Sequence, residues 1–435
     1  VKNDQQLIIS FAMPSIDKFY RQKPESILAY LIGHEGPGSI LSLLKSKQWA
    51  LALTAGSGIN GSNFKDFNIS ISLSELGAKN ITAIVSIVFS YLNLLKKEPL
   101  NEQYYQEKKS LAELSFSYQE KLSPLDSVSQ LVINMQHYPE QDYIFGDYVM
   151  EGQNTATLTA LLEFMVASNM RIISIDKNGS QQPHSSTSKW YQVPYTVNDI
   201  EQQKIEQWQQ AAYLPELSLP NKNPYIVARP ELVKGDNEKN NNLTLPEIIH
   251  KQSGLNVWFK HDTSFNTPKG YIYLSIDSPV VIESASTIAM TRLFIDLYSD
   301  AVIEEHYDAE LAGIHYHLYS HQSGLTLQLS GISTKQEQLL PLLLASLMQG
   351  KFCPNKFELF KQQLLSHWHN AENSKSISQL FASLSATMQP KSPSSKTLIN
   401  ALEKIEFQQF KNFVPQIFEN TAVDVLIHGN WSKQS

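Results

Sequence analysis

The chain has 435 residues, more than one compact core usually accommodates, so two or three domains are expected. Its composition, 42% hydrophobic and 18% charged, is that of a globular protein and excludes general disorder. A formal charge of -7 without any basic run argues against nucleic acid as a partner. Cys353 is the only cysteine, so no internal disulfide or Cys-based zinc site is possible. The longest apolar runs, 83–95 and 339–348, are too short to span a bilayer, and no membrane partner is expected.

The first unusual stretch is "IGHEGPGS" at residues 32–39, where a His and a Glu stand among three glycines. A zincin helix needs H-E-x-x-H, and no second His follows His34 at that spacing. A P-loop needs Lys-Ser/Thr after its last glycine, and Ser39 is followed by Ile40 instead. From its residues alone, the stretch predicts a tight turn between two helices, with Ser39 as the N-cap of the second.

A strand and two helices are predicted next. Residues 67–73 alternate apolar and polar, which is typical of a strand with one buried face. Apolar residues in 80–95 recur every three or four positions and predict an amphipathic helix that buries Val88. Asn93 is predicted on the opposite face, where Asn93→Asp should be nearly silent. After a polar turn, a second helix is predicted over 104–118.

The same order recurs downstream. A strand is predicted at 325–331, a helix at 334–350, a turn at 351–358, and a further helix that includes Gln363 and Leu365. The chain is therefore predicted to be a tandem of two similar α+β domains.

A proline-rich segment separates the two domains. Residues 214–246 hold five prolines, and "GDNEKNNN" occupies 235–242. We expect domains at 1–213 and 247–435, joined by a linker at 214–246. Its Asn-rich centre is predicted to be the first site of proteolytic nicking.

Several motifs in collinear order resemble the second and third domains of the insulinase or pitrilysin family, the insulysin-type inverzincin zinc peptidases. They are "AYLIGHEGPGSILSLLKSKQWALALTAG" at 29–56, "KWYQVPY" at 189–195, "LNVWFKHDTSFNTPKGYIYLSI" at 255–276, "YDAELAGIHYHL" at 307–318 and "LIHGNW" at 426–431. The family's W-Y-G-T-x-Y segment has Gly-Thr where this chain has Gln192 and Val193.

The resemblance implies an α+β fold, a tandem of two LuxS/mitochondrial-processing-peptidase-like domains, each a mixed, largely antiparallel sheet flanked by helices. In that family, four such domains form two bowl-shaped halves that enclose a chamber. Zinc is held in the first domain by H-x-x-E-H and a distant Glu.

This chain has no H-x-x-E-H. The string nearest to it, residues 302–306, has Val302 where the first His would stand. The resemblance therefore implies the noncatalytic, substrate-binding portion of a longer zinc endopeptidase, with neither catalytic residues nor metal ligands in these 435 residues. Val1 enters at what resembles the opening strand of the second domain, so the catalytic domain is expected in the parent. The expected partners are peptide substrates and the remaining domains of that parent. The expected compartment is the periplasm, by similarity to bacterial pitrilysins, with the cytoplasm as the alternative.

The resemblance also assigns an exosite that holds the N-terminal end of a peptide substrate by strand addition. The residues it implies are Gly33, His34, Glu35, Leu53, Thr54 and Ala55. Glu35 would attract the peptide's ammonium group; a solvated or helix-dipole-complementing carboxylate is the alternative. His34 is interpreted as a structural hydrogen-bonding residue.

Two other functions stay open at this point. One is a catalytically inactive scaffold or binding module of the same fold. The other is a metal hydrolase that uses a cluster of His315, His317, His321 and Glu310.

Overall fold

The computed structural model describes residues 5–98, 100–176, 186–233, 245–350, 352–389 and 391–434. Two compact units make up the chain, the first ending at Asn223 and the second beginning at Pro224. The segment 235–242, predicted to be the first nicking site, lies outside the described residues. Among the described residues, no helix combines the length and apolar character needed to cross a bilayer.

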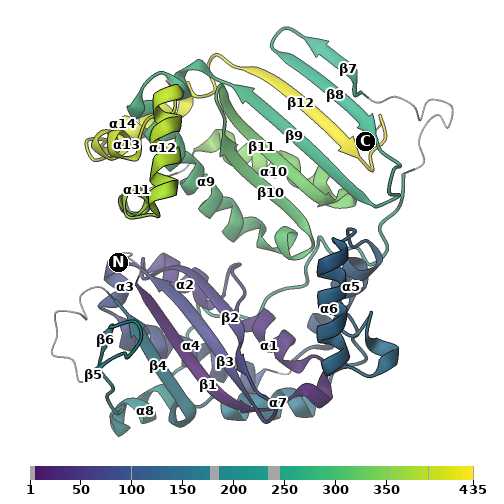
Figure 1. Cartoon of the computed structure of the whole chain (residues 1–435), viewed down its shortest axis with the longest axis vertical. Coiled ribbons are helices and arrows are strands. Elements are labelled where there is room, and N and C mark those ends of the chain that lie inside the picture. The colour runs from purple at the N-terminus through teal and green to yellow at the C-terminus, as the bar shows by residue number, and fades with distance from the viewer. Residues whose placement is uncertain are drawn as a thin grey trace. The chain divides into compact units, whose positions relative to one another are not determined.

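The first unit is built on an antiparallel sheet of four strands in the order β2-β3-β1-β4 (Figure 1). The strands are β1 (Gln6–Pro14), β2 (Ala50–Asn60), β3 (Phe64–Leu73) and β4 (Met170–Ile175). In β3 every second residue from Phe67 to Leu73 is buried, which confirms the predicted strand and its alternation.

The first unit also contains helices, some of which cover the buried face of this sheet. They are α1 (Pro24–Ile32), α2 (Ile40–Ser46), α3 (Glu75–Ala78), α4 (Ile81–Lys97), α5 (Glu102–Ser117), α6 (Pro124–His137), α7 (Thr155–Phe164) and α8 (Gln202–Gln209). Short 3-10 turns span Asp17–Phe19, Glu140–Asp142 and Ala167–Asn169, and a small hairpin pairs β5 (Ser186–Thr187) with β6 (Pro194–Tyr195). The helices predicted at 80–95 and 104–118 are confirmed as α4 and α5.

Helix α4 is buried on most of its surface, including Val88 at 0% exposure. Helix α8 packs on its outer side, where the indole N–H of Trp208 donates to the carbonyl of Thr82 at 3.1 Å. The amide of Asn93 donates to the carbonyls of Gln209 and Ala211 at 3.3 and 3.1 Å. The prediction that Asn93 tolerates change on an open face is therefore wrong, because a distant segment covers that face.

Residues 214–223, which the sequence analysis places in the linker, pack on the first unit. The N–H of Ser218 donates to the carbonyl of Gly38 at 3.0 Å. Gly38 has a φ of +82°, and a Cβ there would come within 2.1 Å of the Ser218 hydroxyl. The hydroxyl of Tyr104 also donates to the carbonyl of Pro220 at 2.9 Å. Residues 214–223 thus contact the glycine-rich loop through Ser218 and belong to the first unit. The division between the units falls after Asn223.

The second unit has a six-stranded sheet in the order β10-β11-β9-β12-β8-β7. The strands are β7 (Glu247–Gln252), β8 (Leu255–His261), β9 (Lys269–Asp277), β10 (Ile314–Ser320), β11 (Gly324–Ile332) and β12 (Ala422–Gly429). Strand β12 separates β8 from β9, pairing parallel with the first and antiparallel with the second. The sheet is mixed and largely antiparallel, as predicted.

The second unit also contains helices, some of which pack against one face of this sheet (Figure 1). They are α9 (Ala285–Leu311), α10 (Gln336–Gln349), α11 (Pro354–Glu372), α12 (Ser376–Met388), α13 (Ser395–Leu402) and α14 (Phe407–Gln416), with 3-10 turns at Pro279–Ile282 and Ser333–Lys335. The strand predicted at 325–331 and the helices that follow it are confirmed as β11, α10 and α11.

The two units share one order of elements. Strands β2-β3-β1-β4 correspond to β10-β11-β9-β12, and α4, α5 and α6 correspond to α10, α11 and α12. One of the differences between them lies next to the glycine-rich loop. Helix α9 runs for 27 residues between β9 and β10, whereas α1 and α2 fill the same place in the first unit, separated by the loop Gly33–Ser39.

Candidate functional site

The glycine-rich loop begins where α1 ends. The N–H of Gly33 donates to the carbonyl of Ala29 at 2.9 Å and closes the helix. A Cβ at position 33 would lie 2.8 Å from that carbonyl oxygen and 3.5 Å from both the Cβ and the N of Ala55 on β2. Glycine at 33 therefore allows the loop to approach the strand closely.

The rest of the loop is held by its own polar groups. His34 is buried, and its Nδ1 accepts the N–H of Gly36 at 3.1 Å while its ring meets Tyr30 edge-on at 6.0 Å. Glu35 beside it is half-buried. The hydroxyl of Ser39 accepts the N–H of Ser42 at 3.1 Å, which confirms Ser39 as the N-cap of α2. These contacts give His34 a structural role in the loop.

The register of β3 decides which way the backbone of β2 points. The N–H of Leu73 donates to Gln5, on the β1 side of β3, at 2.9 Å. The carbonyl of Phe64 accepts from Gly61, on the β2 side, at 3.0 Å. Since backbone groups of successive strand residues alternate in direction, the even-numbered residues of β3, including Ser70, face β2.

The three candidate residues of β2 therefore differ in direction. Thr54 pairs with Ser70, so its N–H and C=O point toward β3. Leu53 and Ala55 present theirs at the outer edge, and among the described residues no strand pairs there. Leu53 as a whole residue is 2% exposed, backbone included, whereas Thr54 is exposed and Ala55 is half-buried. The site thus offers two outward-facing backbone units next to a glycine loop.

A buried carboxylate contacts Tyr30, the residue of α1 whose ring packs against His34 of the loop. Glu107 on α5 is 6% exposed and accepts from the hydroxyl of Tyr30 at 3.3 Å and from the N–H of Asn223 at 3.1 Å. Lys108 lies over the ring of Tyr30 at 5.8 Å, and burial lowers the pKa of its ammonium group. The sequence analysis missed these residues, because nothing in a charged helix such as α5 marks which Glu is buried.

Of the four residues of the alternative metal cluster, Glu310 and His315 contact each other, and His317 and His321 contact residues outside the cluster. Glu310 contacts Nδ1 of His315 at 2.6 Å with one oxygen and accepts the N–H of Tyr316 at 3.1 Å with the other. This hydrogen bond with Glu310 raises the pKa of His315. His317 stacks on Tyr319 at 5.6 Å.

His321 contacts the hydroxyl of Ser275 at 3.2 Å and accepts the N–H of Ser323. Across the described residues, no group of three or more His, Cys, Asp or Glu could hold a metal ion. With no H-x-x-E-H in the sequence either, the residues present do not fit a zinc centre.

The segment "KWYQVPY" supplies β6 and most of the loop that joins β5 to it, and Trp190 in this loop is exposed. Gln192 has a φ of 52°, a left-handed conformation that glycine adopts more readily. The resembling motif has its glycine at this position.

Comparison with known proteins gives matches over the whole chain. Residues 1–111 match the "Peptidase M16 inactive domain", and residues 116–401 match the "Middle or third domain of peptidase M16". This sequence division falls within α5, in the first structural unit.

Human insulin-degrading enzyme is 28% identical over 435 residues, which is 100% of this chain and 42% of that protein. Mouse nardilysin is 30% identical over 376 residues, which is 85% of this chain and 32% of that protein.

The crystal structure of pitrilysin has the same fold, with a TM-score of 0.71 and 24% identity over 99% of this chain and 46% of that one. The chain thus spans less than half the length of the relatives it matches. The family matches cover both units and include the motifs at 29–56, 189–195, 255–276 and 307–318. The chain therefore belongs to the peptidase M16 family of insulin-degrading enzyme, nardilysin and pitrilysin, and it comprises inactive and middle domains of that family.

Proposed function

We propose that this chain is the noncatalytic, chamber-forming and substrate-binding portion of a zinc metalloendopeptidase that degrades peptides. Within it, the loop at 33–35 and the strand at 53–55 bind the N-terminal end of an extended peptide. The observation that carries this proposal is the outward direction of the Leu53 and Ala55 backbone groups beside Gly33. An extended peptide completes such an edge as an added strand.

The geometry favours broad specificity. Main-chain hydrogen bonds are the same for every peptide, so they supply affinity without reading the sequence. The carboxylate of Glu35, half-buried next to Gly33, supplies the charge that a free α-ammonium group requires. The site therefore recognises the start of a chain and its extended backbone, whatever the side chains.

Hydrolysis is assigned to another part of the parent. The residues described here contain no metal-ligand group, and the family matches name an inactive and a middle domain. We expect the purified chain to cleave no peptide and to bind no stoichiometric zinc. One tightly held zinc per chain in elemental analysis would contradict this assignment. An H-x-x-E-H motif in the parent's coding sequence distinguishes a peptidase from a scaffold.

The test is a calorimetric titration of one peptide with a free N-terminus and of its acetylated form. Glu35→Gln should weaken the free form more than the acetylated form, by up to about 1 kcal/mol, because the anion is partly exposed. Glu75→Gln, an exposed carboxylate on α3, is the matched control and should change neither. Equal affinity of the parent chain for both peptides would exclude the ammonium role of Glu35.

The backbone half of the site needs a separate variant. Ala55→Pro removes an outward N–H, and it should weaken both peptides equally without unfolding the first unit, since proline is tolerated at a strand edge. If Ala55→Pro folds and binds like the parent chain, strand addition at β2 is excluded.

A further inference from the structure

Glu107 on α5 is a buried carboxyl group that joins two distant parts of the first unit. Its Oε2 accepts the hydroxyl of Tyr30 on α1 at 3.3 Å, and its Oε1 accepts the N–H of Asn223 at 3.1 Å. These contacts span 77 and 116 positions of the sequence. Among the described residues, no basic side chain forms an ion pair with Glu107. Its oxygens therefore depend on neutral donors, and losing one contact leaves a buried polar atom without a partner.

Tyr30 connects this carboxyl group to the glycine-rich loop. Its ring meets the imidazole of His34 edge-on at 6.0 Å. That imidazole accepts the N–H of Gly36 at 3.1 Å, so its position sets the path of the loop backbone. The side chains of Glu107, Tyr30 and His34 are all buried, and close packing leaves little room for one of them to move alone. A shift of Glu107 should therefore reach the loop through Tyr30 and His34.

Asn223 connects the same carboxyl group to the joint between the units. The first unit ends at Asn223, which is buried, and the second begins at Pro224. Tyr225, the next residue, packs against the hydrophobic core of the second unit. One proline thus separates a residue anchored in the first unit from a residue anchored in the second. Proline fixes its own φ and restricts the residue before it, so this joint is short and stiff.

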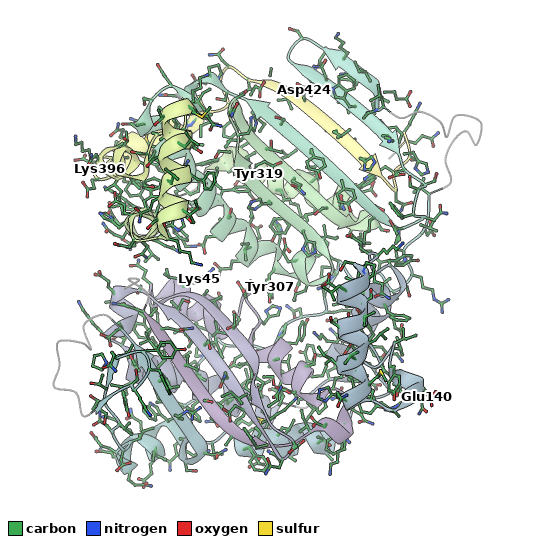
Figure 2. The ribbon with its side chains drawn as sticks, viewed as in Figure 1. Lys45, Glu140, Tyr307, Tyr319, Lys396 and Asp424 are labelled. Atoms are coloured by element: carbon green, nitrogen blue, oxygen red, sulfur yellow. The ribbon has the colours of Figure 1, made fainter. Side chains whose placement is uncertain are left out.

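Tyr225 is held beside α9 in the second unit. Burial raises the pKa of its hydroxyl, and the carboxylates of Asp308 and Glu305 raise it further. Both acidic residues are close neighbours in sequence of Tyr307, which Figure 2 labels on α9. Tyr225 thus moves with the second unit, so a displacement of that unit reaches Asn223 across a single residue.

We propose that Glu107 is a positioning residue that couples the joint at Asn223 to the glycine-rich loop and thereby regulates peptide binding at that loop. This inference rests on the proposed function, which assigns peptide binding to residues 33–35. Glu107 is too buried to touch a peptide, so it acts through the side chains of Tyr30 and His34. Coupling between two sites is reciprocal, so a bound peptide also acts on the joint.

The first test measures the loop without a peptide. Hydrogen exchange of residues 33–39 is compared between the 435-residue chain and Glu107→Gln. A Gln side chain has the same shape but one acceptor fewer, so it loses the contact with Tyr30 or the contact with Asn223. It should speed exchange of the loop on the order of tenfold. Glu113→Gln, the same change at an exposed position of α5, is the matched control and should leave the loop unchanged.

Tyr30→Phe guards this test against a Glu107→Gln chain that does not fold. It removes only the hydroxyl that donates to Glu107 and should speed exchange of the loop in the same way. Unchanged exchange of the loop in whichever of the two variants folds would overturn the proposal.

An insertion tests the joint itself. Two glycines placed between Asn223 and Pro224 release the joint and should speed exchange of the loop by a similar factor. In Glu107→Gln the same insertion should add less than about twofold, because the connecting carboxyl group is already altered. Two glycines after Ser374, in the exposed turn between α11 and α12, are the control. A joint insertion without effect, or with the same effect in both backgrounds, would overturn the proposal.

The affinity for peptides gives the regulatory readout. Glu107→Gln should weaken the peptide with a free N-terminus roughly threefold more than its acetylated form, because it moves the loop that carries Glu35. In a Glu35→Gln background it should not change that difference. Equal weakening of both peptides would show a role in stability alone and overturn the proposal. Altered loop exchange without peptide binding by any version would refute only the proposed function. A difference between the two peptides that survives Glu107→Gln unchanged would refute only this inference.

Discussion

The two units differ between the first two strands that they share, where α9 of the second corresponds to α1 and α2 of the first. Helix α9 spans 27 residues and has a kink at His306, where the backbone leaves the helical conformation. In the first unit, α1 stops at Ile32 and α2 begins at Ile40, with the glycine loop between them. In the first unit, the loop between α1 and α2 brings the backbone of Gly33 close to Ala55 on β2. The same place in the repeated fold thus holds one long helix in the second unit and two shorter helices joined by a loop in the first.

The corresponding edge strands of the two sheets, β2 and β10, also differ in how their outward backbone groups are covered. On β10, the N–H of Tyr316 points outward and is taken by the carboxylate of Glu310. On β2, Leu53 and Ala55 point outward, and within the described part of the chain no side chain hydrogen-bonds to them. Natural proteins often cover exposed edges to prevent pairing with other chains. The second unit follows that rule, whereas no such side-chain hydrogen bond covers the edge of β2 among the described residues.

The largest expected effect tests the similarity of the two cores. Val88 on α4 and Leu343 on α10 are both 0% exposed. Val88→Asp and Leu343→Asp should each cost about 3 kcal/mol or more, because each buries an unpaired charge. Hydrogen exchange should show loss of protection in the changed unit only. Loss in both units from either change would show that they unfold as one.

The next effect distinguishes the two backbone directions in β2. Thr54→Pro removes a hydrogen bond to β3 and should cost roughly 2 kcal/mol of unfolding free energy. Ala55→Pro should cost clearly less, since its N–H lies outside the sheet. Chemical denaturation of the two variants measures both values. The reverse order of stability would mean that the assigned direction of β2 is wrong.

A smaller effect compares the outer sides of α4 and α10. Asn93→Asp places a carboxylate against two carbonyl oxygens and should cost about 1 to 2 kcal/mol. Gln338→Glu, on the exposed first turn of α10, should be neutral or slightly stabilising there. Melting temperatures of the two variants provide the comparison. A silent Asn93→Asp would show that α8 leaves this side of α4.

The smallest effect concerns the covered edge of β10. The pKa of His315 is raised in the folded state by Glu310, so this pair stabilises the protein below the unfolded pKa of about 6.5. That stability is lost as pH rises through the folded pKa. Because the side chain is 62% exposed, solvent screening limits it to a few tenths of a kcal/mol. His315→Gln should remove this difference between pH 5.5 and 9, and an unchanged pH profile would exclude the pair as its source.

The spacing of apolar residues along the sequence predicted individual helices and strands. The spacing in 80–95 and the alternation in 67–73 were sufficient to predict α4 and β3, because each buries one face. The partners of Asn93 could not be predicted, since Gln209 and Ala211 come from a segment more than a hundred residues away.

The candidate site shows the same limit. Its position followed from the resemblance and its glycines from the sequence. The register of β3, however, was needed to show that the backbone N–H of Ala55 points away from the sheet and that of Thr54 points toward β3. The buried state of Glu107 also depends on Asn223, which the chain brings back from beyond α8.

The contact between Gly38 and Ser218 has a consequence for reading genetic variation. A side chain at position 38 would meet the Ser218 hydroxyl, and the φ of +82° disfavours one in any case. Substitutions at Ser218 that enlarge the side chain should therefore reposition the loop from a site 180 residues away. In a deep mutational scan scored by peptide turnover of the parent, Ser218 should behave as a functional residue although it touches no peptide. Its tolerated replacements should be the smallest ones, alanine and glycine.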